Sequence, residues 1–452
     1  MQLLPSAYCR HVPACTPDVV AIVVASMTLV ENLLPVAPLF HGVGPESRHA
    51  RRSKLRIGIC STYAPRACGL ATFAADLERA LLASPDVEAV TMLALDNGES
   101  PWPARSGSVL ARIADHQPAS YRAAAKAADA GCDVVIVQHE FGIFGGTDGA
   151  FVIDLLDALH VPVVLTLHTV VPSFTPGERD VLRRACARAA VVTVFTSTAR
   201  ELLLEQGIAE STRIEVVAHG APGELYDVSR SAARRDLDVS GRFVLSTFGL
   251  VSEGKGIELA IDALPDIISA RPDTLFVIAG RTHPEVVKRH GERYRERLVA
   301  QVHGHGITDH VRFIDGFLPV PAIAQLLAAT DVFLTPYVNP DQIVSGALTF
   351  ALAAGCPVVS TPYQYARDVL LDGAGTIVES RHAPLFAEAV RVYGLQPEAA
   401  ARARSAAHAV GDSMRWTAVG RVVAGLCRSA MRADIRLSAS SAPRIQFPVP
   451  AG

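Results

Sequence analysis

Several features that mark other protein classes are missing from these 452 residues. None of the eight cysteines form a C-x-x-C pair, so the sequence shows no zinc or redox motif, and buried free thiols in a reducing cytoplasm are expected. Lysine occurs only four times, and the formal net charge of −3 provides no basic surface for nucleic acid. No G-x-G-x-x-G follows the first apolar strand, which disfavours a dinucleotide-binding dehydrogenase.

Residues 1–54 read as an N-terminal extension that is disordered or that results from a misassigned start codon. The apolar stretch from Val19 to Phe40 carries Glu31, Pro35 and Pro38, and no basic segment directly precedes it, so it makes a poor membrane span. Two alternatives stay open, namely an amphipathic segment that contacts the inner membrane peripherally and a signal peptide. No later segment is apolar enough to span a membrane, so we expect a cytoplasmic protein that is at most membrane-peripheral.

The rest of the chain alternates short apolar runs with helix-period stretches. Near-continuous apolar runs indicate strands that helices cover on both faces, and their alternation with helices predicts doubly wound parallel sheets. The ten runs are Leu55–Cys60, Asp133–Gln138, Pro162–Leu167, Val191–Phe195, Ile214–Ala218, Phe243–Phe248, Leu275–Ala279, Val311–Ile314, Val332–Leu334 and Pro357–Ser360.

This series of runs divides in two, as the length of the chain also suggests. The polar, arginine-rich segment from Gly220 to Gly241 is interpreted as a linker. We expect Rossmann-like domains over 55–220 and 242–390, then helices over 391–430 that pack back on the first domain with Trp416 as an anchor. Residues 438–452 are expected to be a disordered tail.

Ligands of open parallel sheets bind beyond the carboxyl ends of the strands, so the residues after each run are the candidates for a site. In the first domain His139, His168 and His219 follow three different runs. His168 is either a site residue or a structural histidine at a strand end. His139 and Glu140 either contact a substrate or form a satisfied polar pair. Two such domains facing each other would enclose a cleft for a small molecule.

Two segments of the second domain are candidate phosphate sites. The glycine-rich turn from Gly249 to Gly256, with Gly254 and Lys255, opens a helix, where backbone N–H groups and a lysine can meet an anion. A second helix begins near Ser345, Gly346 and Ala347, whose N–H groups suit a diphosphate. The simpler alternatives are a plain turn for the first segment and tight helix–sheet packing for the second. Gly280 and Arg281 follow the next strand, and Arg281 could equally be an ion-pair residue on the surface.

At these residues the chain resembles the group 1 glycosyltransferases of family 4, a retaining and metal-independent family. The similarity covers about 55–416 and rests on the order of its pieces more than on any one of them. They are "STYAPRACGLATFAADL" (61–77), "VQHEFGIFGG" (137–146), "TLHT" (166–169), "HG" (219–220), Lys255-Gly256, Gly280, "HVRFIDGF" (310–317), "ATDVFLTPY" (329–337) and "ALAAGCPVVSTPY" (351–363).

The resemblance implies a GT-B fold, in which two facing Rossmann-like, doubly wound parallel-sheet domains enclose an interdomain cleft. The first would bind the acceptor and the second the nucleoside diphosphate sugar. It implies that Lys255 and the backbone of 345–347 hold the diphosphate, that Gly69 in its loop approaches the sugar, and that His168 hydrogen-bonds it. A glycan, a lipid-linked molecule or a small molecule would be the acceptor, and neither a cofactor nor a metal ion is implied.

Three positions depart from the family pattern. The family usually has two glutamates eight residues apart, where this chain has Gln342 and Phe350, and its usual loop arginine is Leu250. Gln342 can still hydrogen-bond near the sugar, whereas Phe350 cannot accept a bond from a ribose. Arg281 or Arg66 could supply the lost charge. A subgroup of the family shares the Gln and aromatic pattern, so these departures leave the donor open without implying inactivity.

Two alternatives to a hexosyltransferase remain. A non-catalytic GT-B protein that binds a sugar nucleotide or a glycan would explain the missing glutamates. Another two-domain enzyme, such as a nucleotide-sugar epimerase or a glycan phosphorylase, would share the architecture. The phosphorylase needs a lysine-bound pyridoxal phosphate, and four lysines leave few candidates for it.

Overall fold

The structure is a computed structural model that describes residues 54–66, 68–98, 108–370 and 373–440, with side chains as far as 432. The expectations for residues 1–53 and for 441–452 fall outside these ranges. One compact unit comprises 52–452. Within the described ranges, no helix combines the length and the apolar character that crossing a bilayer requires.

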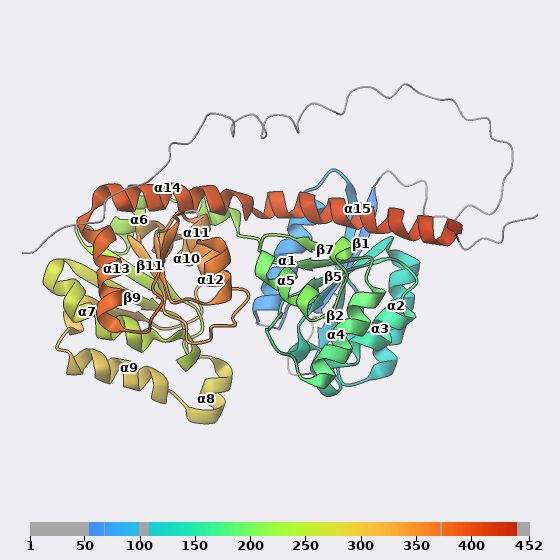
Figure 1. The fold of residues 1–452 in the computed structure, drawn as a ribbon, viewed down its shortest axis with the longest axis horizontal. Helices are drawn as coiled ribbons and strands as arrows, with labels where there is room; N and C mark the ends of the chain where they lie inside the picture. Colours follow the sequence, from blue (N-terminus) through green and yellow to red (C-terminus); the bar gives the residue numbers. More distant parts are fainter. Residues whose placement is uncertain (1–53, 67, 99–107, 371–372, 441–452) are drawn as a thin grey trace, which may run out of the picture. The chain divides into compact units, whose positions relative to one another are not determined.

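The first lobe, which contains the strands labelled β1, β2, β5 and β7 in Figure 1, is built on a parallel sheet. This sheet has seven strands in the order β3-β2-β1-β4-β5-β6-β7. Parallel neighbours need a long crossover, and helices provide it between β1 and β2, β3 and β4, β4 and β5, β5 and β6, and β6 and β7. The strands are β1 (Leu55–Thr62), β2 (Val87–Asp96), β3 (Val109–Ala114), β4 (Val134–His139), β5 (Val163–Leu167), β6 (Val191–Val194) and β7 (Ile214–Val216).

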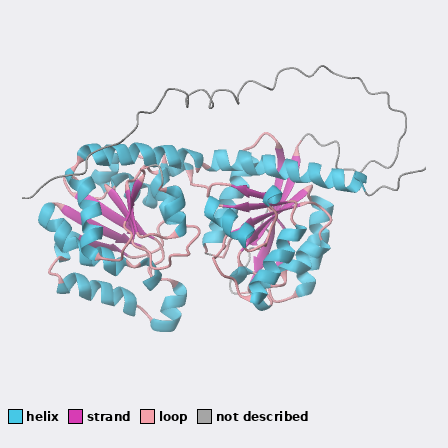
Figure 2. Ribbon diagram, viewed as in Figure 1, coloured by secondary structure: helices cyan, strands magenta, loops and turns pink. Residues whose placement is uncertain are grey.

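Helices cover both faces of this sheet, as Figure 2 shows. They are α1 (Gly69–Leu82), α2 (Pro118–Gly131), α3 (Val152–Ala158), α4 (Pro176–Arg188) and α5 (Ser197–Glu205). Local signals start several of them: Thr175 and Glu178 form a capping box ahead of α4, which has proline in its first turn, and Thr196 caps α5.

The second lobe has a six-stranded parallel sheet in the order β10-β9-β8-β11-β12-β13. Its strands are β8 (Phe243–Phe248), β9 (Thr274–Ala279), β10 (Val311–Ile314), β11 (Val332–Thr335), β12 (Val358–Ser360) and β13 (Gly375–Ile377). Its helices are α6 (Arg230–Asp236), α7 (Ile257–Ala270), α8 (Pro284–His290), α9 (Arg293–Gly304), α10 (Val320–Ala329), α11 (Gly346–Ala353), α12 (Gln364–Val369), α13 (Ala383–Leu395) and α14 (Pro397–Ser413). Two parallel-sheet, Rossmann-like domains were predicted, and the structure confirms them.

The last helix, α15 (Trp416–Ser440), packs along α1 of the first lobe. The ring of Trp416 meets Phe73 edge to face at 4.9 Å, and a β-carbon on Gly220 would lie 2.3 Å from the indole. Gly420 lets the two helix backbones approach, because a β-carbon there would lie 2.8 Å from the carbonyl oxygen of Ala80. Trp416 therefore packs on the first lobe, as expected of an anchor, whereas α13 packs on α7 and α14 packs on α11, both in the second lobe. The helix also continues to Ser440, so it includes the first three residues of the segment expected to be disordered.

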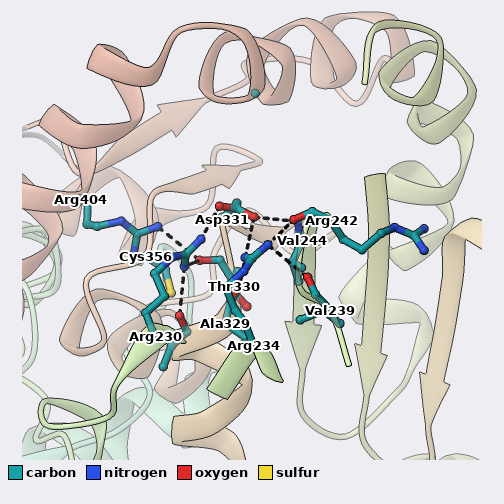
Figure 3. Close-up of polar contacts among 12 residues, drawn as sticks. Arg230, Arg234, Val239, Arg242, Val244, Ala329, Thr330, Asp331, Cys356 and Arg404 are labelled. Carbon is teal, nitrogen blue, oxygen red and sulfur yellow. Dashed lines mark hydrogen bonds and ion pairs between the residues drawn. The ribbon is translucent and has the colours of Figure 1, made fainter. Parts of the chain in front are cut away.

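The expectation that the arginine-rich segment is a linker is wrong for its second half. Residues 230–236 form α6, which packs on α10 of the second lobe. Figure 3 shows Arg230 and Arg234 converging on Asp331, whose carboxylate also accepts from the backbone N–H of Val244 at 2.8 Å. The same two guanidinium groups, with Arg404, donate to carbonyl oxygens of residues 328–330 at the end of α10. Cations at a helix C-terminus satisfy its unpaired carbonyls, so these arginines fasten α6 to the lobe.

Candidate active site

Buried polar atoms without a hydrogen-bond partner concentrate at the carboxyl edges of the two sheets. Folded proteins normally pair such atoms, so each exception needs a reason. Of eleven such side-chain atoms among the described residues, ten lie at these edges and only the indole nitrogen of Trp416 lies elsewhere. They belong to Ser61, Arg66, Gln138 and His139 in the first lobe and to Arg281, Thr335, Tyr337, Tyr363 and Gln364 in the second. The unpaired polar atoms thus cluster at the sheet edges where open parallel sheets usually bind a ligand.

The turns that follow β8 and β9 are joined through their backbones. Gly249 donates its N–H to the carbonyl oxygen of Ala279, and a β-carbon on Gly280 would lie 1.8 Å from the carbonyl oxygen of Gly249. Gly280 also has a φ of 137°, so no other residue fits there. Gly254 differs, because a β-carbon on it would approach nothing nearer than 3.9 Å. Of the loop glycines predicted for the site, Gly280 is therefore required by packing and Gly254 is not.

The ammonium group of Lys255 lies above an aromatic ring. Its Nζ is 4.0 Å from the ring centroid of Tyr337, and Tyr337 stacks on Tyr363 with centroids 5.0 Å apart. No carboxylate among the described residues lies within ion-pair distance of Lys255. Gly256 adopts a left-handed conformation directly under the carbonyl of Pro336, which brings the loop against the end of β11. The lysine charge is thus oriented by an aromatic face without being neutralised, a suitable state for receiving an anion.

The N-terminus of α11 presents backbone donors beside this lysine loop. The hydroxyl of Ser345 caps the helix by accepting from the N–H of Leu348 at 3.3 Å. The N–H groups of Gly346 and Ala347, in the first turn, have no acceptor among the described residues. Around Gly346 there is also open space, since a β-carbon there would meet nothing within 4 Å. The positive end of the helix dipole adds to these donors, as anion sites in other proteins use it.

Two of the three positions that depart from the family pattern, Gln342 and Phe350, make local contacts within this lobe. Gln342 donates its Nε2–H to the carbonyl of Val344 at 2.9 Å, which leaves its amide oxygen available. The ring of Phe350 lies 6.1 Å from that of Phe248, which in turn lies 5.6 Å from Phe333. Phe350 therefore packs on an aromatic cluster of this lobe.

Arg281 extends this edge of the second sheet toward an exposed aromatic residue. Its guanidinium lies 5.8 Å from the ring centroid of Phe317, a side chain that is 68 % exposed. The Nε of Arg281 is buried without a partner, and no ion pair of Arg281 occurs among the described residues. Of the alternatives for Arg281, a surface residue or an ion-pair residue, the described residues show no ion pair, and its side chain is partly buried.

In the first lobe two of the three strand-end histidines, His168 and His219, share an apolar environment. The ring of Phe73, from α1, meets His168 at 4.9 Å and His219 at 5.1 Å. Phe195 contacts the same two imidazoles. Burial lowers the pKa of His168 to about 3, with a smaller effect of the neighbouring histidines, so the ring is neutral at pH 7.

His139 and Glu140 do not form a pair with each other. His139 is fully buried between Phe141 and Phe144, neither ring nitrogen has a partner, and burial lowers its pKa to about 4. Glu140 accepts from the hydroxyl of Thr169 and the N–H of Phe141, while burial raises the pKa of its carboxyl. Glu140 is therefore a satisfied polar group, and the ring of His139 is the unsatisfied one.

Helix α1 begins at Gly69, and the preceding residue, Cys68, provides no side-chain cap. Cys68 instead lies 3.2 Å from the hydroxyl of Thr62 through its sulfur. A β-carbon on Gly69 would meet nothing within 4 Å, so this helix start also faces open space. The described residues contain no group of three or more His, Cys, Asp or Glu side chains arranged to hold a metal ion.

Two residues at this edge received no role from the sequence. Tyr337 lies under Lys255, and Gln138 contacts His168 through its amide oxygen. Both residues lie at strand ends, and this position is the feature of the sequence that could have indicated a role for them. Which side chain each one contacts depends on neighbouring strands that are far away in the sequence.

Comparison with known proteins adds to this geometry. A family model described as "Glycosyl transferases group 1" matches residues 229–410, and one described as "Glycosyltransferase Family 4" matches residues 68–223. A 2-deoxystreptamine glucosyltransferase of Streptomyces kanamyceticus is 31% identical over 217 residues, which are 46% of this chain and 50% of that enzyme. A GDP-mannose-dependent alpha-(1-6)-phosphatidylinositol monomannoside mannosyltransferase of Mycolicibacterium smegmatis is 28% identical over 57% of this chain and 67% of that enzyme. The chain thus matches half of the first relative's length.

Solved structures resemble the fold over a longer stretch. The Anabaena protein HepE in complex with UDP and glucose has a TM-score of 0.65 and 17% identity, with 83% of this chain and 100% of that chain covered. Sucrose-phosphate synthase from Thermosynechococcus elongatus has a TM-score of 0.66 and 19% identity, with 86% and 100% covered. At such identities the likeness concerns the fold alone.

Proposed function

Because this chain belongs to the group 1 glycosyltransferases, we propose that it transfers a hexosyl group from a nucleoside diphosphate sugar to an acceptor hydroxyl with retention of configuration. The observation that carries the proposal is the pairing, at one sheet edge, of an unpaired lysine with the free first turn of α11. Both groups attract the same kind of ligand, a diphosphate.

The chemical step follows from where charge develops. The bond between the sugar's anomeric carbon and the diphosphate oxygen breaks, and a bond from that carbon to the acceptor oxygen forms on the same face. The leaving diphosphate gains negative charge, which Lys255 and the N–H groups of Gly346 and Ala347 stabilise. Preorganised donors of this kind contribute about 3–4 kcal/mol each to catalysis. The departing phosphate oxygen takes the proton of the acceptor hydroxyl, so no protein base is required.

The remaining site residues act on the sugar and on the acceptor. His168 and Gln342 hydrogen-bond the sugar, and Gly69 with the start of α1 approaches it from the first lobe. Gly249, Gly254, Gly280, Arg281 and Ser345 shape the donor site. We assign His139, whose buried ring nitrogens have no partner, and Glu140 to the acceptor side of the site. The lysine and the helix dipole take the role that a metal ion has in other transferases, so neither a metal nor a cofactor is needed.

Two donors deserve the first test. UDP and glucose are bound in the Anabaena neighbour, and the mycobacterial relative is named for GDP-mannose. Thermal unfolding with each nucleotide and each sugar nucleotide would identify the donor, since a ligand at about 100 times its Kd stabilises a protein by about 2.7 kcal/mol. The acceptor is a glycan, a lipid-linked molecule or a small molecule, and the relatives named for 2-deoxystreptamine and for phosphatidylinositol monomannoside support the last two.

Release of the sugar is then followed for the wild type, Lys255→Ala and Lys288→Ala. Lys288 lies on α8 and bonds Glu285, so its loss controls for removing any lysine from this lobe. We expect Lys255→Ala to lose turnover by at least about a hundredfold while Lys288→Ala keeps it. Normal turnover in Lys255→Ala would refute the diphosphate assignment, and inhibition by EDTA would refute metal independence.

A second candidate function is a non-catalytic protein that binds a sugar nucleotide or a glycan. The packing of Phe350 on Phe248 favours it, since no carboxylate stands where the family usually binds the ribose. Binding of UDP-glucose or GDP-mannose without release of sugar, to water or to a panel of acceptors, would support this second function.

A further inference from the structure

A hydrogen bond within the first sheet reaches the histidine that we place at the sugar. The Nε2 of His168 lies 2.6 Å from the amide oxygen of Gln138, and both side chains are buried, at 6 % and 0 % exposure. Strand register explains the contact. Gln138 on β4 is paired with Thr166 on β5, and His168 is two residues further on, so all three side chains lie on the same face of the sheet.

This contact determines where the single proton of the neutral imidazole sits. An amide oxygen only accepts, so the Nε2 of His168 must carry the hydrogen and Nδ1 must carry the lone pair. The other contacts of the ring do not discriminate between its nitrogens. Phe73 and Phe195 meet it edge to face, at 4.9 and 5.0 Å, and hold its plane through apolar packing.

The remaining nitrogen is free for a ligand. No described residue bonds the Nδ1 of His168, although its Nε2 is fully satisfied. A hydroxyl group donates a hydrogen bond readily, so a nitrogen that can only accept is matched to a sugar hydroxyl. If the proton moved to Nδ1, the same atom would become a donor and the match would be lost.

We propose that Gln138 is a positioning residue, which fixes the Nε2–H tautomer of His168 so that Nδ1 accepts a hydrogen bond from a hydroxyl of the transferred sugar. The tautomer itself follows from the contact between His168 Nε2 and the amide oxygen of Gln138, whereas the sugar contact rests on the proposed function. The amide nitrogen of Gln138 is buried without a hydrogen-bond partner, which costs folding free energy. Gln138 is therefore present in the sheet in spite of this cost.

The direct test measures the tautomer in the full chain. Two-bond ¹⁵N–¹H spectra of the protein with ¹⁵N-labelled histidine distinguish the two neutral forms, and His168→Gln identifies the signals of this residue. We expect the Nε2–H form in the wild type. The Nδ1–H form would overturn the proposal, because it would mean that the amide nitrogen, and not the oxygen, faces the ring.

Three variants connect the tautomer to function. Gln138→Leu removes the acceptor, and we expect a mixture of tautomers with kcat lowered about ten- to a hundredfold and KM changed little. Gln138→Glu keeps an acceptor and should retain the tautomer and most of the turnover, while the acid limb of the pH–rate profile moves to higher pH. Thr193→Val is the matched control, because it removes a buried hydrogen bond to Thr166 in the same sheet without touching His168.

The outcomes separate the hypotheses. A Gln138→Leu protein that keeps both the wild-type tautomer and the wild-type kinetics overturns the proposal, as does an equal loss of turnover in Thr193→Val, which would indicate packing alone. If no donor is turned over by the wild type, the proposed function fails, yet the spectra of wild type and Gln138→Leu still decide whether Gln138 sets the tautomer. Thermal unfolding confirms that each variant is folded, and Gln138→Met replaces Gln138→Leu if the latter does not fold.

Discussion

Acid should destabilise the first lobe through its buried histidines, well above the pH at which carboxylates titrate. His139 and His168 are held neutral because burial lowers their pKa values to about 4 and about 3, while an unfolded chain binds a proton on each near pH 6.5. Their folded-state pKa values are depressed, so the neutral rings contribute their full stability above pH 6.5. That stability is lost as the pH falls, because only the unfolded state gains protons.

The size of the effect follows from the two pKa values of each ring. Between pH 7 and pH 5 each buried histidine should cost about 2 kcal/mol, and the pair about 4 kcal/mol. Total stabilities of folded proteins are only about 5–15 kcal/mol, so this is a large fraction. His219 is partly exposed and adds to the effect, since burial also lowers its pKa, to about 4.

The assay is the free energy of unfolding from urea titrations at pH 7, 6 and 5, compared between wild type, His139→Phe and His290→Gln. Phenylalanine fits between Phe141 and Phe144 and cannot take up a proton, so His139→Phe should lose about 2 kcal/mol of the pH dependence. Any change in packing shifts the curve as a whole and leaves its slope unaffected. His290, an exposed residue on α8, is the control and should keep the slope. An unchanged slope in His139→Phe would refute the view that this imidazole is neutral and buried.

Three further predictions concern the second lobe. Tyr337→Phe should leave nucleotide affinity within about twofold of wild type, whereas Tyr337→Leu should weaken it about threefold to tenfold, since the ring face under Lys255 is lost. Isothermal titration calorimetry measures both affinities. Equal affinities of the two variants would contradict the view that the ring of Tyr337 positions Lys255. Asp331→Ala should lower the free energy of unfolding by about 2 kcal/mol, because Arg230 and Arg234 lose a partly buried partner. Nucleotide affinity should stay unchanged, since Asp331 lies at the opposite edge of the sheet from the donor site. A loss of affinity would show that this ion-pair cluster influences the donor site. Gly280→Ala should prevent folding of the loop pair or destabilise it by more than about 2 kcal/mol, visible as a lower midpoint of thermal unfolding.

Sequence patterns located most strands of the sheets but not all. The ten predicted apolar runs all became strands, because a strand covered on both faces needs an uninterrupted apolar run. The runs for β2, β3 and β13 were missed. β3 and β13 are edge strands with partly exposed residues, and β2 carries Glu88 and Thr91 among its apolar residues. Partial exposure removes the signal on which the prediction depends.

The donor-side loops were also within reach of the sequence. Glycines at 249, 256 and 280, a lysine between two of them and a serine before a helix of small residues are local features, and local chain geometry gives them their meaning. The arginine-rich segment before β8 was misinterpreted as a linker, because its partners are Asp331 and the carbonyls at the end of α10, about a hundred residues away. Composition alone does not distinguish a solvated linker from a helix with distant ion pairs.

The sequence by itself determined two parallel sheets, their order along the chain and the strand ends at which polar residues stand, because these depend on hydrophobic periods and on glycine. Only the tertiary structure decided which of those polar residues have partners. Glu140 is satisfied by Thr169, His139 is not satisfied at all, Gln138 bonds His168, and Lys255 rests on Tyr337. The physical reason is that pairing a buried group depends on the register of neighbouring strands and on the loops beside them, which bring together residues that are remote in sequence.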